Sequence, residues 1–243
     1  MALIYAHRGF SALYPENTML AFRKAAMAGA DGIELDVHLS KDGEVMIIHD
    51  EKLGRTCGLD GVVSDYTRTE LEKINAGKTK DERFGFTPIP SLDEYLEFAK
   101  EEGIVTNIEL KTAPVSYPDI EEKVLALVDR YSLSDKVIYS SFNALSVMHL
   151  KMVDGNARTA LLFDACKPMY LGHLLARSGF SYFHPSLDIL SDDVARDMHV
   201  NGIKMNIWTV DGDEKLRKAL SFSPEGIISN DVERAVAYNL KSI

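Results

Sequence analysis

Two carboxylates, Glu34 and Asp36, stand two residues apart in an otherwise apolar stretch, residues 32–37, which has the pattern of a β-strand. Side chains alternate between the two faces of a strand, so both carboxylates point to the same side. The two carboxylates repel each other and lose hydration, and a positively charged partner has to offset this cost. A hard divalent cation suits this role because it prefers oxygen ligands. The pair therefore predicts a metal site.

A second pair with the same spacing ends the strand-like stretch of residues 104–110. Glu109 and Lys111 are two residues apart and share a face. If this strand lies beside the first pair, Glu109 adds a third carboxylate to the same site. We therefore predict that Glu34, Asp36 and Glu109 hold one divalent ion.

Two histidines follow strand-like stretches near these carboxylates. His7 comes directly after residues 3–6, and His49 comes directly after the apolar run of residues 45–48. An unperturbed histidine titrates near neutral pH, so two of them can supply one general acid and one general base. We predict that His7 and His49 are catalytic.

Arg8 and Lys111 add positive charge beside the predicted ion. Arginine offers planar, charge-assisted donors to phosphate oxygens, and lysine offers a point charge. Phe142 and Trp208 also end predicted strands, where they would form an apolar wall for an organic group; the alternative is that both only pack at the rim of the fold. The chain has no Walker-type glycine-rich loop. These residues together predict metal-assisted cleavage of a phosphoester.

The elements that would position these groups alternate regularly between strand and helix patterns. The predicted strands are residues 3–6, 32–37, 104–110, 136–141, 158–163, 182–184, 203–209 and 226–229. The predicted helices are residues 18–28, 91–103, 118–131, 144–152, 168–178, 191–200, 211–220, which an Asp211 cap would open, and 232–240. Eight strands, each followed by a helix, predict an α/β fold of the (β/α)8 TIM-barrel type, with the site at the carboxyl ends of the strands. An open, doubly wound sheet is the alternative.

Residues 51–90 interrupt this alternation and are rich in Gly, Asp, Thr and Lys. Thr67 and Glu70 have the spacing of a capping box, and Gly77 would end the helix that they start. We predict a small insertion after the second barrel strand, with one short helix. No linker-like segment divides the chain, so residues 1–243 are expected to form a single TIM-barrel domain.

Composition limits the classes of partner. The formal net charge of −10 disfavours non-specific binding to nucleic acid or to an anionic membrane, which require a basic surface. The sequence has neither a signal-peptide pattern nor an apolar run of about 18 residues. Its two cysteines, Cys57 and Cys166, form no CxxC motif, which is typical of a reducing compartment. We expect a cytoplasmic protein without a membrane span that acts on a small molecule.

Five short motifs, in this order and spacing, resemble the glycerophosphodiester phosphodiesterase family: His7-Arg8-Gly9, Pro15-Glu16-Asn17-Thr18, Glu34-Leu35-Asp36-Val37, His49-Asp50 and Ile108-Glu109-Leu110-Lys111. The strand–helix alternation, with the stretch Trp208-Thr209-Val210, extends the likeness over essentially the whole chain. One departure follows the last predicted strand. Family members often have a Thr-Asp pair there, whereas this chain reads Ser229-Asn230-Asp231, which leaves the role of an acid at that position open.

The resemblance implies a TIM barrel with a small insertion after the second strand, in agreement with residues 51–90. It implies an Mg or Ca ion on the three carboxylates, His7 and His49 as the acid–base pair, and Arg8 with Lys111 on the phosphate. Family substrates are deacylated phospholipids, which are hydrolysed to glycerol 3-phosphate and an alcohol. Glu16 and Asn17 match the family motif after the first strand, and we expect them to shape the rim of the site.

Two alternatives stay open. The same barrel could act as a lysophospholipase D or a phospholipase-C-like phosphodiesterase on lipid substrates. It could instead be a non-catalytic phosphate-ligand-binding barrel, which the presence of both His7 and His49 disfavours. The sequence does not decide the alcohol headgroup, the metal, which histidine is the acid, whether water or a glycerol hydroxyl attacks, or the oligomeric state, with a homo-oligomer among the options.

Overall fold

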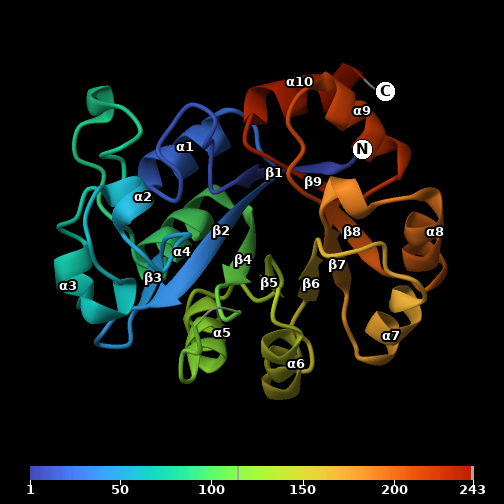
Figure 1. The fold of residues 1–243 in the computed structure, drawn as a ribbon, viewed down its shortest axis with the longest axis horizontal. Helices are drawn as coiled ribbons and strands as arrows, with labels where there is room; N and C mark the ends of the chain where they lie inside the picture. The colour runs from blue at the N-terminus through green and yellow to red at the C-terminus, as the bar shows by residue number, and fades with distance from the viewer. Residues whose placement is uncertain (114, 242–243) are drawn as a thin grey trace.

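The strands of this protein form a closed sheet. The computed structural model describes residues 1–113 and 115–241. Their strands form one sheet in the order β1-β9-β8-β7-β6-β5-β4-β2-β3, and a further pairing of β1 with β2 closes it. All neighbouring strands are parallel except β3, which is antiparallel to β2. The predicted (β/α)8 TIM barrel is confirmed (Figure 1).

The observed elements follow the predicted alternation, with shifts of a few residues at their ends. The strands are β1 (Leu3–His7), β2 (Gly32–Leu39), β3 (Val45–Ile47), β4 (Val105–Leu110), β5 (Val137–Ser141), β6 (Thr159–Phe163), β7 (Tyr182–Pro185), β8 (Lys204–Ile207) and β9 (Gly226–Ser229). The helices between and after the barrel strands are α1 (Met19–Met27), α4 (Leu92–Glu102), α5 (Ile120–Arg130), α6 (Ala144–Val153), α7 (Leu171–Arg177), α8 (Asp192–Val200), α9 (Asp213–Ser221) and α10 (Val232–Lys241). A short 3-10 helix, η3 (Leu187–Ile189), follows β7.

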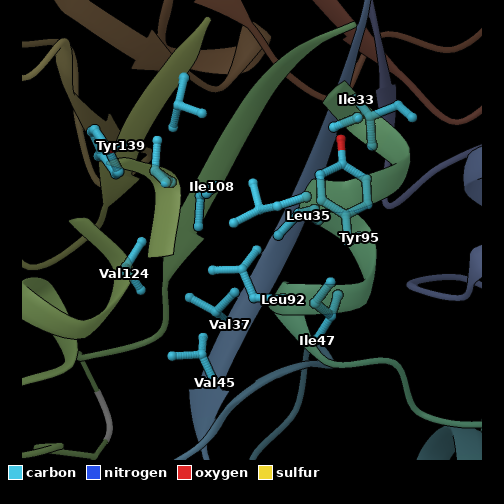
Figure 2. Packing of buried hydrophobic residues seen from close by; sticks show 14 of the residues in the cluster. Ile33, Leu35, Val37, Val45, Ile47, Leu92, Tyr95, Ile108, Val124 and Tyr139 are labelled. Atoms are coloured by element: carbon cyan, nitrogen blue, oxygen red, sulfur yellow. The ribbon is translucent and has the colours of Figure 1, made fainter. Parts of the chain in front are cut away.

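Strand β2 separates the hydrophobic layer from the site. Ile33, Leu35 and Val37 are fully buried and pack in a cluster that includes Leu92 and Tyr95 of α4 (Figure 2). Burying one such aliphatic side chain contributes roughly 1.5–3 kcal/mol, so a slip of the strand by one residue would be costly. This alternation turns the residues between them, including both carboxylates of β2, to the inside of the barrel.

The interior below the carboxylates is filled by side chains. Tyr5, Ile138, Tyr182 and Ile228, from four different strands, form a buried cluster there with Ala160. Tyr5 lies against Gly32, where an added Cβ would come within 2.5 Å of its ring, so the glycine at the start of β2 is needed for this packing. The filled layer leaves room for a site at the opposite, carboxyl end of the strands.

The helix boundaries show which sequence signals were decisive. Thr18 caps α1 by accepting a hydrogen bond from the Ala21 backbone N–H, and Ser91 caps α4 by accepting one from Glu94. Gly103 ends α4 in the left-handed conformation that favours glycine. The predicted start and end of α4 are therefore confirmed.

The insertion differs from the prediction in detail. The capping box of Thr67 and Glu70 is present, but α3 (Arg68–Leu71) ends well before Gly77. Asn75, between the end of this helix and Gly77, instead forms a β-bridge with Pro88. The insertion also holds a second short helix and two 3-10 helices, α2 (Gly54–Cys57), η1 (Val63–Asp65) and η2 (Glu82–Phe84), so the expectation of one helix was wrong.

A small hydrophobic core of its own supports the insertion. It contains Met46 of β3 and Ile48, which directly follows β3. The other members are Leu53, Cys57, Val63, Leu71, Ile74, Ala76 and Ile89. Figure 1 shows the insertion, with α2 and α3, beside β2, β3 and α1. None of the helices described for residues 1–113 and 115–241 is both long and apolar enough to cross a lipid bilayer.

Candidate active site

The carboxyl ends of the barrel strands surround a cavity of about 160 Å³. The nine residues predicted from the sequence gather there. Eight of them line the cavity, namely His7, Arg8, Glu34, His49, Glu109, Lys111, Phe142 and Trp208, and the ninth, Asp36, is fully buried and lies within 4.8 Å of the two glutamates. The structure therefore brings all of them together, while their roles remain proposals.

The three carboxylates meet because their strands are neighbours in register. Asp36 of β2 is paired with Glu109 of β4, and Glu34, two residues before Asp36, lies on the same face of β2. One oxygen of each lies within 4.8 Å of the others, and all three residues are buried. Asp36 Oδ1 accepts no hydrogen bond, although Lys111 Nζ lies 3.5 Å away. A buried set of carboxylate oxygens with one lone pair unused fits a hard divalent cation.

The electrostatics of the three carboxylates show an excess of negative charge. Burial, and then Asp36 and Glu109, raise the pKa of Glu34 well above its usual range. Burial, and then Asp36, raise the pKa of Glu109 to about 7. Burial would also raise the pKa of Asp36, but Lys111 and Arg8 outweigh it and lower that pKa. The local arginine and lysine thus compensate one carboxylate well, and a bound cation would compensate the other two.

Arg8 sits in a tight turn directly after β1. Its backbone has a φ of +56°, which lets its N–H donate to Glu34 Oε2 at 3.0 Å. The following Gly9 packs against Ala21, where a Cβ would approach within 2.8 Å. The Arg8 guanidinium lies with Nε 3.4 Å from Asp36 Oδ2, partly buried at the cavity wall. The His-Arg-Gly motif is thus a local structural requirement as well as a source of charge.

His7 is held by an amide from the other end of the chain. Its Nδ1 lies 2.7 Å from Asn230 Oδ1, and its Nε2 lies 3.9 Å from Glu34 Oε2. Asp211 accepts hydrogen bonds from Asn230 Nδ2 at 2.7 Å and from its backbone N–H at 2.9 Å. The prediction that Asp211 caps the following helix was wrong. Gly212 precedes α9, because the Asp211 side chain turns back to hold Asn230.

His49 is held by a carboxylate and a lysine. Its Nδ1 lies 2.6 Å from Asp50 Oδ1, and Lys111 Nζ lies 3.1 Å from its Nε2. Lys111 Nζ also donates to Glu109 Oε1 at 2.7 Å. Because an ammonium can only donate, His49 Nε2 is the acceptor and Nδ1 carries the proton given to Asp50.

An aromatic pair forms one wall of the cavity. The rings of Phe142 and Trp208 meet edge to face, with centroids 5.6 Å apart. Trp208 Nε1 donates to the backbone carbonyl of His184 at 2.8 Å, which fixes the indole. Phe142 is 37% exposed, so this wall extends to the solvent at the rim. The pair offers an apolar surface for the carbon skeleton of a ligand.

A second group of possible metal ligands lies between α5 and α6, away from the cavity lining. It comprises Glu121, Glu122 and His149, with His149 Nε2 3.0 Å from Glu122 Oε1. Ser146 donates a short hydrogen bond to Glu121. Only one of its three residues is buried, whereas all three barrel carboxylates are, so the group serves as a natural comparison for them.

Several residues of the site were not singled out as functional from the sequence. Asn107 lines the cavity, is 1% exposed and has an Oδ1 without a hydrogen-bond partner. The alternation of β4 could have found it, because it lies two residues before Glu109 on the same face. Asn230 was visible only as the polar end of the last strand, and nothing in the spacing pointed to Arg55, which contacts Asp50.

Comparisons with known proteins agree with this geometry. Residues 7–234 match the family model described as the glycerophosphoryl diester phosphodiesterase family. A glycerophosphodiester phosphodiesterase of Caldanaerobacter subterraneus subsp. tengcongensis is 37% identical over 234 residues, which cover 96% of each chain. The crystal structure of a glycerophosphodiester phosphodiesterase from Agrobacterium tumefaciens superposes with a TM-score of 0.85, at 28% identity and over 98% of this chain and 100% of that one. A glycerophosphodiester phosphodiesterase from Thermotoga maritima gives 0.78, at 29% identity and over 98% of both chains.

Proposed function

This chain belongs to the glycerophosphoryl diester phosphodiesterase family, and from that premise we propose how its cavity hydrolyses a glycerophosphodiester to glycerol 3-phosphate and an alcohol. The observation that carries the proposal is the meeting of three buried carboxylates and two oriented histidines in one cavity. This combination supplies a cation site and two proton-transfer groups around one phosphate.

Glu34, Asp36 and Glu109 would hold one divalent cation, Mg or Ca. The oxygen-only donor set and the excess of negative charge support this assignment. When bound, the ion would supply Lewis-acid polarisation of the phosphoryl oxygens. Arg8 and Lys111 would bind the remaining phosphate oxygens, because both line the cavity beside the carboxylates.

His7 and His49 would move the protons. Each ring is fixed through Nδ1, so that Nε2 of His7 points toward Glu34 and Nε2 of His49 points toward Lys111. One Nε2 would accept the proton of the attacking hydroxyl, and the other would return a proton to the leaving alkoxide. Phe142 and Trp208 would contact the glycerol side of the substrate and exclude water from it.

The size of the cavity bears on the substrate. A volume of about 160 Å³ suits a small, dissolved diester better than a lipid with a long acyl chain. The free Cys57 and Cys166 are consistent with action in the cytoplasm. We therefore propose a cytoplasmic enzyme in which the barrel and its insertion work as one domain on small glycerophosphodiesters.

Turnover of a substrate panel tests the function. Glycerophosphocholine, glycerophosphoethanolamine and glycerophosphoglycerol should all be cleaved with Mg or Ca and not after chelation. The headgroups should differ in kcat/KM by no more than about 10-fold, because the side chains assigned above contact the phosphate and the glycerol side of the substrate, so the alcohol contributes only small binding differences. Analogues that lack the glycerol hydroxyls should lose much more. A strong preference for one headgroup, with indifference to the glycerol hydroxyls, would contradict the proposed orientation.

A further inference from the structure

The side chain of Arg55 connects two parts of the active site through two carboxylates. Its Nε donates to Asp50 Oδ2 at 2.5 Å, and its Nη1 and Nη2 donate to the two oxygens of Glu16 at 2.8 and 2.7 Å. Asp50 uses its other oxygen to hold His49 Nδ1. One planar guanidinium thus fixes both carboxylates at once, which the single ammonium of a lysine does not do in this geometry.

Glu16 continues the connection to Arg8, so that the contacts close into a ring. Arg8 Nη1 donates to Glu16 Oε1 at 2.9 Å, and Arg8 Nε lies 3.4 Å from Asp36. Lys111 Nζ lies 3.5 Å from Asp36 Oδ1 and 3.1 Å from His49 Nε2. Negative and positive side chains alternate in the order Asp50, Arg55, Glu16, Arg8, Asp36 and Lys111. His49 closes the ring between Lys111 and Asp50.

Arg55 is the member of this ring that comes from the helical part of the insertion. It lies on α2, and Thr79 Oγ1 donates to its backbone carbonyl at 2.6 Å. Cys57 on the same helix is 1% exposed and packs in the small core of the insertion. The Arg55 side chain is 47% exposed. A half-exposed arginine contributes little hydrophobic burial, so its three short hydrogen bonds serve mainly to orient their acceptors.

We propose that Arg55 is a positioning residue of the hydrolytic site, and that placing it is a function of the insertion. Arg55 orients His49 through Asp50 and orients Arg8 through Glu16. The proposal rests on the proposed hydrolysis of glycerophosphodiesters. Misplacing His49 lowers kcat, because proton transfer depends on geometry, whereas misplacing Arg8 raises KM through the weaker hold on the phosphate.

Steady-state kinetics of Arg55→Ala and Arg55→Lys with glycerophosphocholine test this role. Arg55→Ala should lower kcat by roughly 10-fold to 10²-fold and raise KM, as expected for small displacements of catalytic groups. Arg55→Lys keeps the charge but holds only one carboxylate, so it should recover only part of the loss. In the double variant with Asp50→Asn, the loss in kcat should not exceed that of the more impaired single variant by much, because both changes affect kcat through the contact between Arg55 and Asp50. The rise in KM, which depends on the contact with Glu16, should persist in the double variant.

Arg83 provides a matched control within the insertion. It is an exposed arginine on η2 that pairs with Asp81 at 3.4 Å and stacks on Phe84, and these partners lie outside the cavity lining. Arg83→Ala should leave kcat and KM within about twofold of the wild type, as is usual for an exposed pair. The proposal is overturned if folded Arg55→Ala behaves like Arg83→Ala, or if the kcat losses of Arg55→Ala and Asp50→Asn multiply in the double variant.

A readout without turnover separates this proposal from the proposed function. In the wild type, ¹⁵N NMR of the imidazoles should show His49 with its proton on Nδ1, since Asp50 accepts from Nδ1 and Lys111 donates to Nε2. The signal is assigned with His49→Gln. Arg55→Ala frees Asp50 from its fixed orientation, so the Nδ1 signal of His49 should shift or broaden, and Arg83→Ala should leave it unchanged. Arg55→Lys takes the place of the alanine variant if that variant unfolds. A wild type that hydrolyses no glycerophosphodiester defeats the proposed function alone, whereas an unchanged His49 spectrum in the Arg55 variant defeats the positioning role.

Discussion

The surroundings of His7 and His49 differ in charge, although both rings are held through Nδ1. The partner of His7 is the neutral amide oxygen of Asn230, at 2.7 Å, and the nearest carboxylate on that side, Asp211, stands behind the amide. The partner of His49 is the carboxylate of Asp50, at 2.6 Å. One histidine is thus oriented by a dipole and the other by a full negative charge.

The difference assigns the two roles that the sequence left open. A carboxylate in contact stabilises an imidazolium, whereas a neutral amide mainly fixes the ring orientation. Burial, and then Arg8, lower the pKa of His7 to about 4, so His7 is unprotonated at neutral pH and is available as a general base. His49 is then left to supply the proton for the leaving alkoxide, and its Nε2 can do so once Lys111 moves from that nitrogen to the phosphate. We therefore predict that His7 is the base and His49 the acid.

The largest effect should come from removing one of the three carboxylates proposed to hold the cation. Glu34→Gln, Asp36→Asn and Glu109→Gln should each lower kcat/KM by roughly 10³-fold, about 4 kcal/mol of transition-state stabilisation, because each removes an oxygen donor for the cation. Titration calorimetry with Mg and Ca should show weaker binding. Glu122→Gln, in the group between α5 and α6, is the control and should change neither quantity. Full turnover by the wild type after exhaustive chelation would remove the metal from this picture.

Removing either histidine should have the next largest effect and should tell the two apart. His7→Ala and His49→Ala should each cost roughly 10²-fold in kcat, as is typical for loss of general acid–base catalysis, while the divalent ion still binds. A nitrophenyl diester has a leaving group that needs little protonation. On this substrate His49→Ala should recover most of its rate and His7→Ala should not. Recovery of His7→Ala instead would reverse the assignment, and near-wild-type rates of both variants on glycerophosphocholine would make the histidines structural.

The barrel was predictable because its signals are local and repeated. The alternation of Ile33, Leu35 and Val37 with two carboxylates determines which face of β2 turns inward, and the caps at Thr18 and Ser91 set the helix starts. The insertion was less predictable. Past the early end of α3, Asn75 forms a bridge to a residue 13 positions later, and no local pattern reports such a contact.

The site was predictable only where function and strand ends coincide. Glu34, Asp36 and Glu109 could be grouped because parallel strands end at the same edge. The partners of the histidines could not, since the contact of His7 with Asn230 joins residues 223 positions apart and Asp211 looked like an ordinary helix cap. These supporting contacts are set by the closed barrel, so they emerge only from the three-dimensional structure.

The smallest effect should come from exchanging the amide and the carboxylate that hold the two histidines, Asn230 at His7 and Asp50 at His49. This exchange tests the comparison most directly. Asn230→Asp places a carboxylate against His7, which already faces Glu34 and Arg8. The added negative charge should raise the pKa of His7. Because the base acts when unprotonated, the acidic limb of the kcat/KM profile should move to higher pH by about one unit, equivalent to about 1.4 kcal/mol. Activity at the optimum should also fall, by roughly 10-fold, because the new carboxylate faces Asp211 Oδ2, to which the Asn230 amide donates at 2.7 Å in the wild type.

Asp50→Asn is the reciprocal change on the other side. It removes the negative charge beside His49 Nδ1 and leaves an amide oxygen that still accepts from that nitrogen. Because this change acts on His49 and not on His7, it should lower kcat while the acidic limb of the kcat/KM profile stays in place. Comparing the acidic limb in both variants separates the two sides, because only Asn230→Asp should move it. If Asp50→Asn moved the acidic limb and Asn230→Asp did not, the roles of the two histidines would be the reverse of those proposed.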